Sequence, residues 1–129
     1  MQKRSAAWQS RMRTFLCHCR ASTPGEQADR IREARILMRA APGEAPDGAN
    51  DREFERMLAQ AAYECAALDV LGSRSEFELS GGTIRACSAS VRLPGQREAC
   101  SGEGRTIALA LLAAWAEAQI VEAERSLVD

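Results

Sequence analysis

A long alanine-rich segment near the end of the sequence constrains the fold more than any other feature. Residues 107–116 read IALALLAAWA without a charged residue, and the helical pattern extends over 106–126. A helix that is apolar nearly all round must be covered on more than one side. The apolar run has about half the length that a bilayer crossing needs. We therefore predict a helix buried inside a folded domain and no membrane-spanning segment.

Before this helix the apolar period changes from helical to two. Residues 76–80 read EFELS, which places Phe77 and Leu79 on one side of a strand and two glutamates on the other. We interpret the glutamates as part of a solvated sheet face. The dipeptide Gly81-Gly82 predicts a tight hairpin turn.

A second strand is expected over 83–93 and a short third strand over 96–102, with a turn at Pro94-Gly95 between them. The apolar phase of the second strand slips along its length. A bulge near 87–89 would reconcile the two phases. The expected register places Ala89 opposite Cys100, and Cys87 only diagonal to that cysteine, so no strain-free disulfide is predicted between them.

Two amphipathic helices are expected at the start of the chain. The first covers 5–20 and carries a basic face opposite its apolar face. The second begins at Thr23-Pro24, where Glu26 completes a capping box. The two apolar faces comprise Trp8, Met12, Phe15, Leu16 and Cys19, and Ile31, Ala34, Leu37, Met38 and Ala41.

A third helix is expected over 51–71. Asn50 is its predicted N-cap, and Gly72 ends it where a left-handed residue is favoured. Its apolar stripe comprises Phe54, Leu58, Ala61, Cys65 and Leu68.

The order of elements predicts an α+β fold with N-terminal helices, a three-stranded antiparallel sheet and a long Ala-rich C-terminal helix packed on the sheet. The 129 residues have the size of one domain. We divide them into a basic helical hairpin (1–41), a loop (42–50) and an α-β-β-β-α unit (51–129). Helices 51–71 and 106–126 are expected to share the apolar sheet face. The first two helices either complete that layer or project from it.

The net charge of −1 conceals a strong segregation of charge. Residues 1–20 carry five basic residues and no acid, whereas 42–72 carry seven acids against two arginines. The basic helix could contact nucleic acid, an acidic membrane or an acidic protein, or dock on the acidic helix 51–71 of its own chain or of a second copy. The candidate partner-binding residues are Arg11, Arg13, Arg20, Glu53, Glu55, Glu64 and Arg105.

No cysteine or histidine pattern predicts a catalytic or metal site. The five cysteines have irregular spacing, and we expect them to be reduced and mostly in the core. Cys17 and Cys19 point to different sides of a helix, so they cannot chelate one metal together. His18 is the only histidine and is expected on an exposed polar face. We predict no catalytic residue, no cofactor and no metal.

The segment SGEGR, residues 101–105, lies just before the last helix. Glycines before a helix N-terminus can cradle an anion, but a phosphate or dinucleotide loop would need a longer glycine pattern. We interpret this segment as an ordinary strand-to-helix turn in which Gly104 supplies backbone freedom.

The stretch ACSGEGRTIALALLAAWAEA, together with the α-β-β-β-α order, resembles the double-stranded-RNA-binding domain. That resemblance implies a final helix that begins with phosphate-binding lysines. Here the corresponding positions read Arg105, Thr106 and Ile107, so most of the basic charge that drives binding is missing. The same stretch also resembles small phage proteins of the α-β-α sandwich type. That second resemblance implies a product of a phage or another mobile element.

From these observations we expect a small non-enzymatic protein in the cytoplasm of a bacterial host, which docks on a host protein complex as an anti-CRISPR-like inhibitor of defence. A homodimer is a further expectation. The alternative is a nucleic-acid-binding module that uses the basic helix, through Arg11 and Arg13, or a sheet and turn like those of the double-stranded-RNA-binding domain. An enzyme would require a deep pocket around His18 or Glu103.

Overall fold

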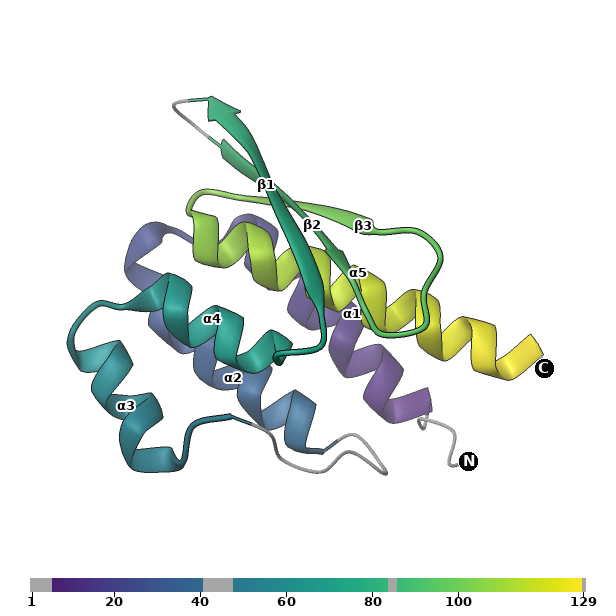
Figure 1. Ribbon diagram of the computed structural model, residues 1–129, viewed down its shortest axis with the longest axis horizontal. Coiled ribbons are helices and arrows are strands. Elements are labelled where there is room, and N and C mark those ends of the chain that lie inside the picture. The colour runs from purple at the N-terminus through teal and green to yellow at the C-terminus, as the bar shows by residue number, and fades with distance from the viewer. Residues whose placement is uncertain (1–5, 41–47, 84–85, 129) are drawn as a thin grey trace.

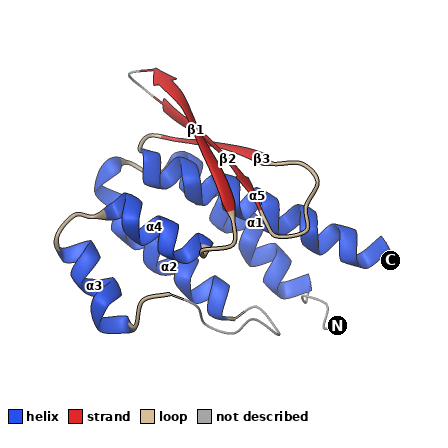
Figure 2. Cartoon of the chain, in the orientation of Figure 1, coloured by secondary structure: helices blue, strands red, loops and turns tan. Residues whose placement is uncertain are grey.

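The computed structural model describes residues 6–40, 48–83 and 86–128. Within these residues the chain forms five α-helices, a 3₁₀ turn and one three-stranded sheet (Figures 1 and 2). Most of the predicted loop 42–50 lies outside the described residues. The elements are α1 (Ala6–Ala21), a 3₁₀ turn (Pro24–Glu26), α2 (Gln27–Arg39), α3 (Asp51–Ala59), α4 (Tyr63–Leu71), β1 (Glu76–Thr83), β2 (Ala86–Arg92), β3 (Cys100–Gly104) and α5 (Ile107–Val128).

Helix α5 lies at the centre of the molecule. Residues 108–116 are all buried, which confirms the prediction from their composition. Strands β2 and β3 cover one side of α5, and helices α1, α2 and α4 pack on it from other sides (Figure 1). Trp115 meets Phe15 of α1 edge to face, with ring centroids 6.2 Å apart. The α+β fold with a C-terminal helix packed on an antiparallel sheet is therefore present.

The first two helices form as their periodicity predicts. All five predicted apolar residues of α1 are buried, as are Ile31, Ala34 and Leu37 of α2. The indole N–H of Trp8 donates to the carbonyl oxygen of Leu37 at 3.0 Å and joins the two helices. Both helices contribute to the same hydrophobic core as α5 and the sheet. The predicted Ala41 contact lies outside the described residues.

The prediction of one helix over 51–71 is wrong. The chain leaves the helix at Gln60, and Ala61 adopts a left-handed φ of 56°. The N–H groups of Ala61 and Ala62 donate back to the carbonyls of Leu58 and Met57, which closes α3 before α4 begins. No glycine marks this break in the sequence, and the apolar spacing continues across it, so the sequence predicted one continuous helix.

The break also changes which residues of this region are buried. Ala61 and Cys65, expected on the apolar stripe, are exposed, and Leu68 is only half-buried. Helix α4 restarts the helical phase and buries another set of residues against the core. That set is Ala66, Ala67, Val70 and Leu71.

The glycine pair is not the predicted hairpin turn. Strand β1 continues through it to Thr83, and its register with β2 shifts between the pairs Ser80–Ser88 and Thr83–Ala86. Two residues of β1 therefore oppose one residue of β2. The bulge lies at Gly81-Gly82 in β1, and not at 87–89 in β2, because a strand accommodates an extra residue most easily where no Cβ is present.

The expected register between β2 and β3 is also wrong, by two residues. Val91 pairs with Cys100, and Ala89 pairs with Gly102. The predicted turn at Pro94-Gly95 is present, since the N–H of Gln96 donates to the carbonyl of Leu93 at 3.0 Å, and residues 97–99 lengthen the connection before β3. The side chain of Gln96 is buried. Its amide oxygen accepts the N–H of Leu93 at 2.9 Å, and its amide nitrogen donates to the carbonyl of Ala118 in α5 at 3.0 Å.

Gly102 and Gly104 lie within β3 rather than in a turn, and both are buried. Neither has a positive φ, so the explanation for Gly104 through backbone freedom is wrong. A Cβ on Gly102 would lie 2.7 Å from the carbonyl carbon of Ala113 and 2.8 Å from Cα of Ala114. A Cβ on Gly104 would lie 2.8 Å from the backbone nitrogen of Ala110. The glycines are needed because β3 lies directly against the backbone of α5.

We predict that Gly102→Ala lowers the free energy of unfolding by about 2–3 kcal/mol, because its Cβ would overlap backbone atoms that cannot rotate away. Urea denaturation measures this change. Gly25→Ala is the matched control, since the nearest atom to a Cβ there is 3.9 Å away, and it should change stability by less than about 0.5 kcal/mol. Equal effects of the two substitutions would contradict the close contact.

Candidate functional site

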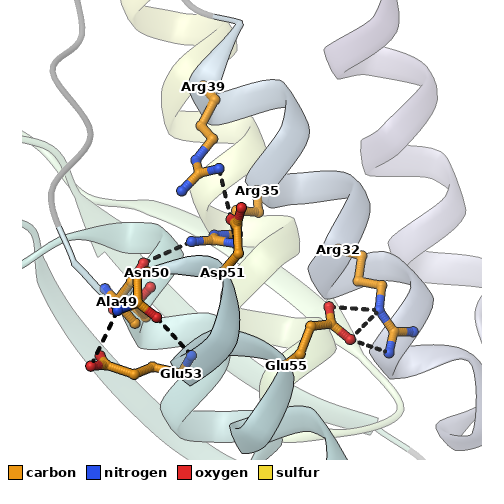
Figure 3. Close-up of polar contacts among 9 residues, drawn as sticks. Arg32, Arg35, Arg39, Ala49, Asn50, Asp51, Glu53 and Glu55 are labelled. Carbon is orange, nitrogen blue, oxygen red and sulfur yellow. Dashed lines mark hydrogen bonds and ion pairs between the residues drawn. The ribbon is translucent and has the colours of Figure 1, made fainter.

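The largest polar cluster joins α2 to α3 (Figure 3). Arg35 is 8% exposed, and its guanidinium donates to Asp51 at 2.6 Å and to the carbonyl oxygen of Ala49 at 2.7 Å. The same guanidinium lies 4.3 Å from the ring centroid of Phe54. Arg39 donates to the same carboxylate of Asp51 at 2.9 Å. This arrangement holds the start of α3 against α2.

A second contact between the same helices involves Glu55. Arg32 donates to both carboxylate oxygens of Glu55, at distances from 2.9 to 3.3 Å (Figure 3). The hydrogen bond from Arg32 lowers the pKa of Glu55. Both side chains are about half exposed, so this pair contributes little to stability by itself. The carboxylate of Glu55 is therefore already hydrogen-bonded within the chain.

The three acidic residues predicted to bind a partner have different environments. Glu55 is paired with Arg32, as described. Glu53 lies at the start of α3, where its backbone N–H donates to the side chain of the N-cap Asn50 at 2.9 Å. Glu64 is exposed in the first turn of α4. Of the three, only Glu55 forms an ion pair within the described residues.

The basic residues of α1 do not contact the acidic helix α3. Arg13 forms an ion pair with Glu124 of α5 at 3.0 Å, on an exposed part of the surface. Arg11 lines a shallow depression of about 190 Å³ with Ser10, Thr14 and residues of α2. The internal docking of helix 5–20 on 51–71 is therefore corrected, since α2 supplies the arginines that pair with α3.

Two predicted arginines that are distant in the sequence lie beside one pocket. Arg20, near the end of α1, and Arg105, before α5, line a pocket of about 430 Å³ beside β3. Ser101 and Glu103 also line it. Arg105 donates to the carbonyl of Ala21 at 3.5 Å. This pocket combines two positive charges with one negative charge.

His18 lies in a small polar group at the end of α1. Its Nδ1 is 3.7 Å from a carboxylate oxygen of Glu33 and 3.2 Å from the guanidinium of Arg30. Arg30 also forms an ion pair with Glu33 at 2.8 Å. No serine or cysteine nucleophile is bonded to the His18 ring within the described residues. This geometry is that of a charged surface cluster.

The cysteines divide between core and surface. Cys19 is buried, and burial raises the pKa of its thiol to about 12. Burial also raises the pKa of Cys100. Both thiols are therefore protonated and poorly nucleophilic at neutral pH. Cys87 and Cys100 are partly buried and pack against the core, whereas Cys17 and Cys65 are exposed. Three of the five cysteines therefore lie in the core or against it, as predicted. Within the described parts of the chain, no three acidic, cysteine or histidine side chains gather into a metal site.

The remaining candidate surface is the open edge of the sheet at β1. The strand order is β1-β2-β3, so β1 pairs on one side only among the described strands. Residues 76–80 are all exposed, and Phe77 and Leu79 are 44% and 49% exposed. Their partners Val91 and Ala89 are buried, so these two apolar side chains lie on the α5-facing side of the sheet.

The sizes of the side chains on the α5-facing side of the sheet explain why Phe77 and Leu79 are exposed. One row across the sheet reads Leu79, Ala89 and Gly102, so the residues become smaller toward β3. Helix α5 packs against β2 and β3, where the side chains are small. Helix α4, expected to share this face, instead packs mainly on α2 and α5. The apolar side of β1 is left without a helix over it.

Comparisons with models of protein families, with curated proteins and with solved structures found no match. Among the described helices, none is long and apolar enough to cross a membrane. The candidate sites therefore depend on the geometry of this chain alone.

Sequence reasoning missed two features of these surfaces. It did not select Arg32, Arg35 and Arg39, because three acids nearby leave segment 21–41 with little net charge. Their spacing of three and four residues places them on one helix face, and that was the available signal. It also placed Phe77 and Leu79 on the apolar sheet face without recognising that no described helix packs over them.

We predict that Asp51→Asn makes stability less sensitive to acid. Hydrogen bonds from Arg35, then Arg39, lower the pKa of Asp51. A lowered pKa stabilises the fold above the ordinary carboxyl pKa of about 3.9, and this stabilisation is lost as the pH falls through the folded-state value. Urea denaturation across the range below about pH 4 measures it. Arg39→Met should give an intermediate slope, and an unchanged slope in Asp51→Asn would contradict the ion pair.

Proposed function

We propose that this chain is a small non-enzymatic protein-binding protein, and that it acts by docking on a host protein complex as an anti-CRISPR-like inhibitor of defence. The observation that carries the proposal is the open edge of β1 with two large apolar side chains exposed on it. Exposed edge strands of this kind are normally covered by a partner or blunted by charge.

Several charged side chains are already paired within the chain, which favours recognition of a partner by shape over recognition by net charge. The acids of α3 are partly occupied by arginines of α2, and Arg13 is occupied by Glu124. Among the described strands, β1 is the one that exposes large apolar side chains, Phe77 and Leu79. The phage context rests on the resemblance of the C-terminal segment to small phage proteins.

We expect the double variant Phe77→Ser/Leu79→Ser to lose capture of the host complex by at least about tenfold, because each lost apolar contact removes about 1.5 kcal/mol or more. A pull-down from nuclease-treated bacterial lysate measures capture. Ile36→Ser is the matched control, since Ile36 is 60% exposed on α2, and it should leave capture unchanged. Capture that survives the double variant would exclude β1 as the docking surface.

The inhibitory role is tested separately in a CRISPR-immune bacterium. Expression of the wild-type chain should restore plaque formation by a targeted phage, and the Phe77→Ser/Leu79→Ser protein should not. The control Ile36→Ser protein should restore plaques as the wild type does. Full immunity in the presence of the wild-type chain would contradict inhibition in that system, even if the chain captures a protein.

Nucleic-acid binding is the second candidate, and the shared pocket of Arg20 and Arg105 is the observation that favours it. Glu103 in the same pocket reduces the positive potential there. A mobility-shift titration with duplex RNA and duplex DNA tests this candidate. If nucleic-acid binding at this pocket holds, the double variant Arg20→Gln/Arg105→Gln should make the negative slope of log affinity against log salt shallower by about 1–2. A slope that does not change would exclude this pocket as the phosphate contact.

A further inference from the structure

The exposed part of β1 has two chemically different faces. Phe77 and Leu79 form an apolar face toward α5, and Glu76 and Glu78 lie on the outer face. Arg92 of β2 forms an ion pair with Glu76 and also donates to the carbonyl of Gln96 at 2.9 Å. The hydrogen bond from Arg92 lowers the pKa of Glu76.

Glu78 is the acid of this strand that remains available. Glu78 pairs with Ser90 of β2, and Ser90 pairs with Ser101 of β3, so no cation lies in this row of the sheet. Within the described residues, Glu78 has no ion pair. An approaching strand would therefore meet an uncompensated negative charge at the middle of the exposed edge.

The surface beside this edge has room for the side chains of a partner. A depression of about 500 Å³ lies over the first half of β1 and the facing part of β2, mainly on the outer face of the sheet. Its lining residues are Ser75, Glu76, Phe77, Glu78, Ser90, Arg92 and Ala99. The end of β1 extends beyond α5 (Figure 1).

On the basis of the proposed protein-binding function, we propose that the partner adds an extended segment to β1 as a fourth strand. Apolar residues of this segment pack on Phe77 and Leu79, and a Lys or Arg between them faces Glu78. An added strand satisfies the backbone groups of the open edge, and alternate side chains give specificity on the two faces.

Charge disfavours a second copy of this chain as the occupant. Two β1 strands related by a two-fold axis present the same face to each other. Centred on Phe77, the pairing places Glu76 opposite Glu78 of the other copy; centred on Glu78, it places that residue opposite itself. Centred on Leu79, the two Glu78 residues lie diagonally across the axis. The first two arrangements place like charges directly opposite each other, which destabilises a strand pair, and the third places them about 7–8 Å apart on the diagonal.

Selection from a displayed library of random ten-residue peptides tests this proposal with the full chain as bait. The enriched peptides should alternate apolar residues with Lys or Arg. In fluorescence polarisation, Glu78→Lys should weaken an enriched peptide roughly tenfold, and the same peptide with Glu at its basic positions should regain binding. Glu64→Lys is the matched control and should leave both affinities unchanged.

Backbone pairing has its own signature. Methylation of alternate backbone amides of the enriched peptide should abolish binding for one set of alternate positions and be tolerated for the other, because only one set faces β1. Sedimentation of the free chain should show a monomer. A β1-mediated dimer, or enriched peptides that neither alternate nor respond to Glu78→Lys, would overturn the proposal.

The protein-binding function and the added strand can be tested separately. If no strand-like peptide is enriched but Phe77→Ser/Leu79→Ser still loses capture of the host complex, the protein-binding function stands and the added strand is wrong. If capture survives the double variant, the docking surface itself lies elsewhere.

Discussion

The close contact between β3 and α5 determines how the rest of the chain can pack. Gly102 and Gly104 allow the strand to lie against the backbone of α5, and Ala110, Ala113 and Ala114 keep that side of the helix small. Alanine and glycine give little apolar area each, so the contact depends on closeness rather than on large side chains. Larger residues, among them Phe15 and Trp115, fill the opposite side of α5.

This contact has a consequence at the other edge of the sheet. Because α5 lies nearest the glycines of β3, the larger side chains of β1 lie away from it. Phe77 and Leu79 therefore occupy the correct face of the sheet and yet remain exposed. The packing that stabilises the domain and the surface proposed to bind a partner thus have one geometric cause.

Sequence patterns correctly predicted the elements whose apolar spacing alone determines which of their sides is buried. Helix α1 and the buried centre of α5 follow directly from the spacing and composition of their apolar residues. The break at Ala61 was not predicted, because no glycine marks it and the apolar spacing continues across it. The bulge was placed in β2 instead of β1, because a slip in apolar phase does not say which strand carries the extra residue. Among the candidate residues, the proximity of Arg20 and Arg105 could not be predicted, since 84 residues separate Ala21 from Arg105 in the contact that joins their segments.

By itself the sequence determined that a helix apolar on all sides would be enclosed, that strands would precede it, and that basic and acidic segments would alternate. Periodicity and composition are local properties, and they decide which element forms and which of its sides is buried. Only the tertiary structure decided that α2 rather than α1 pairs with the acids of α3, and that β1 stays uncovered. Those outcomes depend on which surfaces meet. The arginines of α2 meet the acids of α3, and the close approach of the β3 and α5 backbones leaves β1 away from the helix.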